Sequence, residues 1–152
     1  MRHTLFKFAG AVIPALMLIP AAHAAEEAGV VKTSKGMASI QRGGQKQAAV
    51  IGSKVFASDR VVTGADGSVG ITLRDNTMLS AGPNSTLELN KFAFDSTTHA
   101  GTIDASVKRG TLSVISGKIA KATPASIRYT TPTVTLGVRG TEFVIDAGQQ
   151  GE

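Results

Sequence analysis

Apolar and polar residues alternate along most of the chain, which is the pattern of β-strands with one buried face. The alternation is clearest over residues 69–73, 86–89 and 103–107. Turn-forming residues separate the strand-like runs at intervals of about eight to twelve residues. Beyond the apolar N-terminal run, no segment has apolar spacing of three and four over a helical length. The pattern predicts a single compact all-β domain of short strands, a β-sandwich or β-roll, with a solenoid-like stack as the alternative.

The alternation changes register near Gly110 and again near Gly140. Over residues 130–138 the large apolar side chains occupy even positions, whereas further on they are Phe143 and Ile145. A shift of one residue would move every side chain of a continuous strand to the opposite face. We therefore predict a bulge or tight turn at Arg139-Gly140, where glycine would permit a positive φ.

The first 24 residues have the pattern of a secretory signal peptide. Arg2 and Lys7 flank the start of an apolar run, and Ala22-His23-Ala24 places small residues where a signal peptidase reads them. A membrane anchor would need roughly 20 apolar residues, and this run is shorter and contains two prolines. We expect cleavage after Ala24. The other expected boundaries are a flexible lead-in at 25–29, the β-domain at 30–146 and a C-terminal tail at 147–152.

Composition excludes several kinds of site. The chain has no Cys, and two of its three His residues lie in the predicted signal peptide. Only His99 is left, so a zinc or copper site lacks ligands. Loss of Arg2 and Lys7 lowers the formal net charge from +5 to +3. The only adjacent basic pair in the mature part is Lys108-Arg109, so no nucleic-acid partner is predicted. With no second apolar segment, we expect a periplasmic protein, or alternatively a secreted one.

Signatures of catalysis are weak. A nucleophile–His–Asp arrangement would have to use His99 with Asp95 or Asp104, and the strained Gly-x-Ser-x-Gly turn is missing. Four further residues beside turns lack the spacing of a calcium loop, so we interpret them as turn formers. They are Asp59, Asp66, Asp75 and Asn76. We expect no enzymatic activity, no metal and no cofactor.

The charges beside the second register shift are the best candidates for a contact surface. Arg139 and Glu142 flank Gly140, and if Phe143 points into the core then Glu142 points away from it. One interpretation is that Arg139 and Glu142 contact a partner. The other is that Arg139 pairs locally with a carboxylate and pins the bulge.

Several short motifs, taken in order, resemble the FecR domain. They are Thr63-Gly64-Ala65-Asp66-Gly67-Ser68, Leu73-Arg74-Asp75, the segment 82–89, Arg109-Gly110-Thr111-Leu112, Thr131-Pro132 and the segment 138–143. The resemblance covers roughly residues 30–145 and implies an extracytoplasmic all-β module. It marks seven residues as motif positions of structural importance. These are Gly64, Gly110, Thr131, Pro132, Gly140, Thr141 and Phe143.

The best-known FecR proteins carry a signal from an outer-membrane receptor to a cytoplasmic sigma factor. Those regulators begin with an anti-sigma segment and a membrane helix, where this sequence has a signal peptide, so their sigma-regulating role is not expected. The resemblance implies a non-catalytic module for envelope signalling or protein binding, with a protein partner in the envelope. An open final strand would also allow pairing with a second copy.

Two other functions stay open. A module that binds carbohydrate or another envelope polymer would need exposed aromatic side chains, whereas the aromatic residues here mostly alternate with polar ones and are assigned to the core. They are Phe56, Phe92, Phe94, Tyr129 and Phe143. A hydrolase built on His99 is the more remote alternative.

Overall fold

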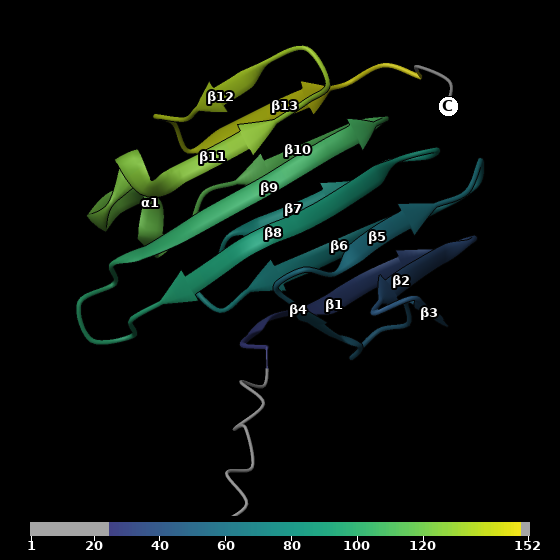
Figure 1. Cartoon of the computed structure of the whole chain (residues 1–152), viewed down its shortest axis with the longest axis horizontal. Helices are drawn as coiled ribbons and strands as arrows, with labels where there is room; N and C mark the ends of the chain where they lie inside the picture. The colour runs from purple at the N-terminus through teal and green to yellow at the C-terminus, as the bar shows by residue number, and fades with distance from the viewer. Residues whose placement is uncertain (1–24, 150–152) are drawn as a thin grey trace, which may run out of the picture.

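The computed structural model describes residues 25–149, in which thirteen strands, one short helix and one 3-10 turn are present (Figure 1). The strands are β1 (Glu27–Lys35), β2 (Ala38–Arg42), β3 (Gln45–Ala48), β4 (Lys54–Phe56), β5 (Arg60–Thr63), β6 (Ser68–Leu73), β7 (Met78–Ala81), β8 (Thr86–Phe94), β9 (Gly101–Arg109), β10 (Thr111–Ile115), β11 (Ile127–Thr130), β12 (Thr135–Gly137) and β13 (Glu142–Asp146). Helix α1 (Lys118–Ala122) and the 3-10 turn η1 (Pro124–Ser126) connect β10 to β11. The predicted cleavage after Ala24 falls outside the described residues.

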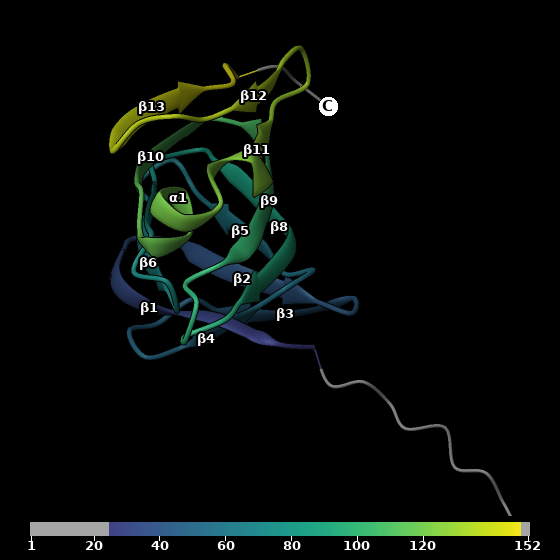
Figure 2. The same ribbon diagram turned by 90° about the vertical axis from the view of Figure 1, so that its left-hand side faces the viewer.

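The strands form two sheets, and the chain passes repeatedly from one to the other. The first sheet has the order β13-β10-β7-β6-β1-β4, and the second has the order β12-β11-β9-β8-β5-β2-β3. Apart from β1 and β2, which lie inside β4 and β3, strand numbers rise steadily along both sheets. The turned view shows α1 at one end of the space between the sheets (Figure 2). The prediction of a single all-β domain is confirmed.

The core lies between the two sheets and is filled by the alternate residues that the sequence pattern predicts. In β6, Val69, Ile71 and Leu73 are at most 2% exposed, and their neighbours in the strand are half-buried. In β9, Ile103 and Val107 are buried from the opposite side. Burial of each such Val, Leu or Ile side chain contributes about 1.5–3 kcal/mol. The alternation therefore aligns each strand with the core.

Both register shifts occur where the chain crosses between sheets. β9 and β10 belong to different sheets and meet at Gly110, whose φ is +79°. β12 and β13 also belong to different sheets and are joined by residues 138–141. The predicted break at Arg139-Gly140 is present, since β12 ends at Gly137 and β13 begins at Glu142, but it is a crossing between sheets and not a bulge within one strand. The positive φ expected at Gly140 is wrong, and a Cβ there would meet nothing within 4 Å. The apolar side chains change parity because each sheet faces the core from its own side.

The predicted lead-in and connecting segments are more ordered than expected. Strand β1 begins at Glu27, and Ala28 is fully buried, so the lead-in at 25–29 is wrong from Glu27 onward. β1 starts this early because it pairs with both β4 and β6. The sequence shows no helical spacing over residues 118–125, but they include α1, in which Ile119 is fully buried.

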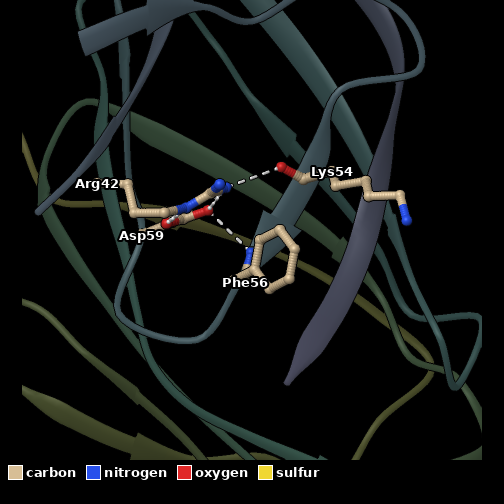
Figure 3. A network of polar contacts seen from close by, with 4 residues as sticks. All are labelled: Arg42, Lys54, Phe56 and Asp59. Carbon is tan, nitrogen blue, oxygen red and sulfur yellow. Dashed lines mark hydrogen bonds and ion pairs between the residues drawn. The ribbon is translucent and has the colours of Figure 1, made fainter. Parts of the chain in front are cut away.

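An ion pair fastens the end of the sandwich that holds β3 and β4 (Figure 3). The Nε and Nη2 atoms of Arg42 donate to the two carboxylate oxygens of Asp59, each at 2.7 Å. Arg42 also donates to the carbonyl of Lys54 at 3.1 Å, and the backbone N–H of Phe56 donates to Asp59 at 2.8 Å. The hydrogen bond to Asp59 raises the pKa of Arg42. The pair joins β2 of one sheet to β4 of the other.

Replacing Gly110 and Gly140 by Ala should separate the two register shifts. Gly110→Ala places a Cβ 2.1 Å from Ser85 Oγ at a positive φ, so we expect a loss of about 1–3 kcal/mol in the free energy of unfolding. Gly140→Ala should change it by less than about 0.5 kcal/mol. Urea unfolding measures both, and equal losses would contradict the assignment of Gly140 to open space.

The Arg42–Asp59 pair should matter more than the exposed pair Lys54–Glu27, which lies nearby. The Asp59 side chain is fully buried, so Asp59→Asn should cost about 1–3 kcal/mol by weakening its charged hydrogen bonds. Glu27→Gln should cost less than about 1 kcal/mol, because Lys54 and Glu27 are 63% and 35% exposed. Urea unfolding of the two variants should therefore differ, and a larger loss for Glu27→Gln would contradict this account.

Candidate interaction surface at the α1 end

A buried carboxylate holds α1 in the space between the sheets. Asp75 is fully buried; it accepts hydrogen bonds from the Thr77 hydroxyl at 2.7 Å and from the Ile119 N–H at 3.2 Å. Its backbone carbonyl accepts from Lys118 N at 2.8 Å, and Thr77 Oγ1 accepts from Gly117 N at 3.0 Å. Asp75 is thus a turn former, as predicted, because it also accepts from Thr77 N. It has the additional role of anchoring α1.

The loop that joins β12 to β13 lies beside α1. The Thr141 carbonyl accepts a hydrogen bond from Ser116 N at 2.7 Å, which fixes the loop to the end of β10. A groove of about 490 Å³ separates the loop from α1. Its lining residues are Ser116, Gly117, Ala120, Lys121, Pro124, Arg139, Gly140 and Thr141. A second hollow, of about 500 Å³, lies on the other side of Arg139.

Arg139 and Glu142 lie close together in the chain, on the loop and at the start of β13, and both are exposed. Within residues 25–149, no ion pair of 4.0 Å or less includes Arg139. The local pairing that would pin a bulge is therefore not formed. The contact of these two residues with a partner stays a prediction.

Strand β13 pairs with β10, and within residues 25–149 no strand pairs with its other edge. Val144, at its centre, is 68% exposed. On the inner side, the Phe143 ring packs edge-on against Tyr129, with ring centroids 5.4 Å apart. Burial, and to a smaller extent the charge of Asp75, raises the pKa of Tyr129, which keeps the phenol neutral. The Phe143–Tyr129 contact joins β13 to β11 of the other sheet.

Thr131 and Pro132 form the turn of the β11–β12 hairpin. Thr131 N donates to the Val134 carbonyl at 2.7 Å, and Thr131 Oγ1 accepts from Val134 N at 3.1 Å. Pro132 lies between two strands, where no backbone N–H donor is needed. Gly64, at another turn, donates to the Met37 carbonyl at 2.8 Å. These motif residues therefore form turns.

His99 lies in the exposed turn between β8 and β9, with φ of 61°. Its ring stacks on Phe94 at 6.2 Å, and its backbone N–H donates to Asp95. The Asp95 carboxylate accepts from Thr97 N and Thr98 N, and these donors lower its pKa. Asp104 accepts instead from Asn90 at 3.0 Å. Within residues 25–149, neither predicted carboxylate partner is hydrogen-bonded to the imidazole.

Metal-binding groups and membrane-spanning helices remain to be considered for residues 25–149. No group of three or more His, Asp or Glu side chains there is placed to hold a metal ion. No helix there has the length and apolar character to cross a membrane. The site is therefore an open surface: a groove, an exposed loop with two charges, and a free sheet edge.

The comparisons assign the family. A family model described as FecR protein matches residues 59–152, which is more than half of the chain. The chain therefore belongs to the FecR family, a family involved in envelope signalling. No curated protein and no solved structure matched the chain.

Sequence reasoning missed α1 and the groove beside it. The segment Lys118–Ala122 contains good helix formers, Lys and Ala, which was the available signal. Five residues are too few to show helical periodicity. The sequence pattern therefore does not indicate Lys121, which lines the groove together with Arg139.

The anchoring role of Asp75 can be tested against an exposed turn residue. Asp75→Ala removes the acceptor for Thr77 and Ile119, so we expect a loss of about 2–4 kcal/mol in the free energy of unfolding. Asp66→Ala, at an exposed turn where Asp66 accepts a long bond from Met37 N, should lose less than about 1 kcal/mol. Denaturant titration measures both, and equal small losses would overturn the anchor.

Proposed function

We propose that this FecR-family chain is an exported, non-catalytic module that binds a protein partner in the cell envelope. The observation that supports it is the open edge of β13, with Val144 exposed at its centre and Glu142 at its start. A free edge offers backbone N–H and C=O groups to which an extended segment can add as a further strand. The exposed Arg139 lies next to this edge and supplies a second charged contact.

The burial of the aromatic residues favours a protein partner over a carbohydrate. Phe92 and Tyr129 are at most 5% exposed, and Phe143 packs on Tyr129. The Phe56 ring is covered by the guanidinium of Arg42, 4.3 Å from its centroid. Sugar-binding surfaces stack sugars on exposed aromatic faces, and these four rings do not offer such a platform.

The charges of β13 favour a different protein over a second copy of this chain. Two copies paired antiparallel about Val144 would place Glu142 of one opposite Asp146 of the other. Like charges directly opposite each other destabilise a strand pair. A partner strand with basic residues at those positions would instead be attracted.

Site-specific crosslinking tests the edge contact. A photoreactive benzoylphenylalanine in place of Glu142 should capture a discrete envelope protein in cells. Adding Val144→Lys should abolish this capture, because a lysine on an edge strand opposes strand addition. The same photoreactive group at Met37, which is 69% exposed on the β1–β2 turn, is the matched control and should capture nothing specific. Equal capture from Met37, or capture that survives Val144→Lys, would contradict the proposal.

Export has its own test. Sequencing the amino terminus of protein recovered from the periplasmic fraction should find Ala25 as the first residue, because Ala22-His23-Ala24 fits signal peptidase. Membrane-bound protein with an intact Met1 would contradict cleavage.

A further inference from the structure

Three neighbouring hollows lie on the α1 end. The groove beside α1 shares Pro124 and Arg139 with the second hollow, and the second hollow shares Ala125 with a third of about 230 Å³. Their lining residues extend from the loop before β13, across η1, to β9 and β11. We name them together the basic groove, after the four cationic residues in their lining. They are Lys91, Lys121, Arg128 and Arg139.

The four cations of the basic groove are exposed and have no ion-pair partner within 4.0 Å in residues 25–149. Of the ten other cations in residues 25–149, five are also without an ion pair and five are paired with carboxylates. The unpaired ones are Lys32, Lys35, Lys46, Arg109 and Lys118, and the paired ones are Arg42, Lys54, Arg60, Arg74 and Lys108. The one carboxylate that lines the basic groove is Asp104, so the formal charge of its lining is +3. No ion pair in residues 25–149 reduces the positive charge of this lining.

The lining also shows what kind of anion fits. Apolar side chains of Pro124, Ala125 and Val138 lie between the cations, so an occupant gains both apolar and charged contacts. No aromatic residue lines any of the three hollows, which leaves no surface on which sugar rings or nucleobases could stack. A polypeptide with carboxylates spaced between apolar residues matches this alternation. We propose that the basic groove binds an acidic polypeptide segment.

This contact differs from strand addition at β13, although Arg139 lies beside both surfaces. The edge of β13 has acidic residues at both ends, whereas the basic groove is positive. The two surfaces therefore select segments of opposite charge. A single partner that presents both would be held at two points, with an affinity greater than either contact supplies.

Binding of an oligoglutamate peptide to the exported protein tests the proposal. Fluorescence anisotropy of the labelled peptide should show saturable binding that weakens as salt is added. The double variant Lys121→Gln/Arg139→Gln should weaken binding by about tenfold, from two exposed charge contacts. Thermal unfolding should be unchanged, because both side chains are exposed and without ion pairs.

The matched control removes the same charge elsewhere. Lys32 and Lys35 are exposed on β1 at the other end of the molecule, so Lys32→Gln/Lys35→Gln should leave oligoglutamate binding within about twofold of the parent. Equal weakening by both double variants would show general attraction to a basic protein and overturn the proposal. Dextran sulfate is the second probe. If it binds in a way that depends on Lys121 and Arg139 while oligoglutamate does not bind, the occupant is a polysaccharide and the proposal is wrong.

The outcome is independent of the edge contact. Val144→Ser should leave oligoglutamate binding unchanged, because Val144 does not line the basic groove. Loss of crosslinking from Glu142 with oligoglutamate binding intact would contradict the proposed edge contact alone. Crosslinking without oligoglutamate binding would contradict the basic groove alone.

Discussion

The buried carboxylate of Asp75 is the interaction on which the α1 end of the molecule depends. A charge without contact with water is stable only when hydrogen bonds surround it, and Thr77 and Ile119 supply those bonds. The same bonds prevent α1 from moving away from the sheets. Residues of α1 line the basic groove. Asp75, although it is buried, therefore determines the shape of a solvent-exposed surface.

The strands could be predicted because burial imposes a period of two on the side chains. Residues 69–73 show that period in the sequence and alternate in burial in the structure. In residues 103–107 the predicted apolar positions are buried, and Ser106 between them is buried as well. The crossing between sheets could not be predicted, because a bulge and a change of sheet produce the same shift in parity. Gly110 lies where Ser85 leaves no room for a Cβ, and its φ is positive. The positive φ expected at Gly140 is not found, and open space surrounds that residue.

The site could be predicted only in part. Arg139 and Glu142 stand out in the sequence because they flank Gly140, where the register shifts, and both are exposed. The basic groove depends on contacts between distant parts of the chain, such as Asp75 with Ile119, which are 44 residues apart. The pattern of residues along a short segment does not indicate such long-range contacts. For the same reason the turn-forming role of Asp75 was recognised and its anchoring role was not.

The order of the strands has a consequence for recognition. In both sheets the strand order follows the chain toward β12 and β13, so each later strand pairs with the outer edge of an earlier one. The open edge of β13 is the last of these steps, and nothing in its backbone distinguishes it from the edges that the chain has already covered. A partner strand that pairs with β13 would thus extend the first sheet in the same direction in which the later strands of the chain extend it. Partner binding would then use the same backbone hydrogen bonding between neighbouring strands that holds the sheet together within the chain.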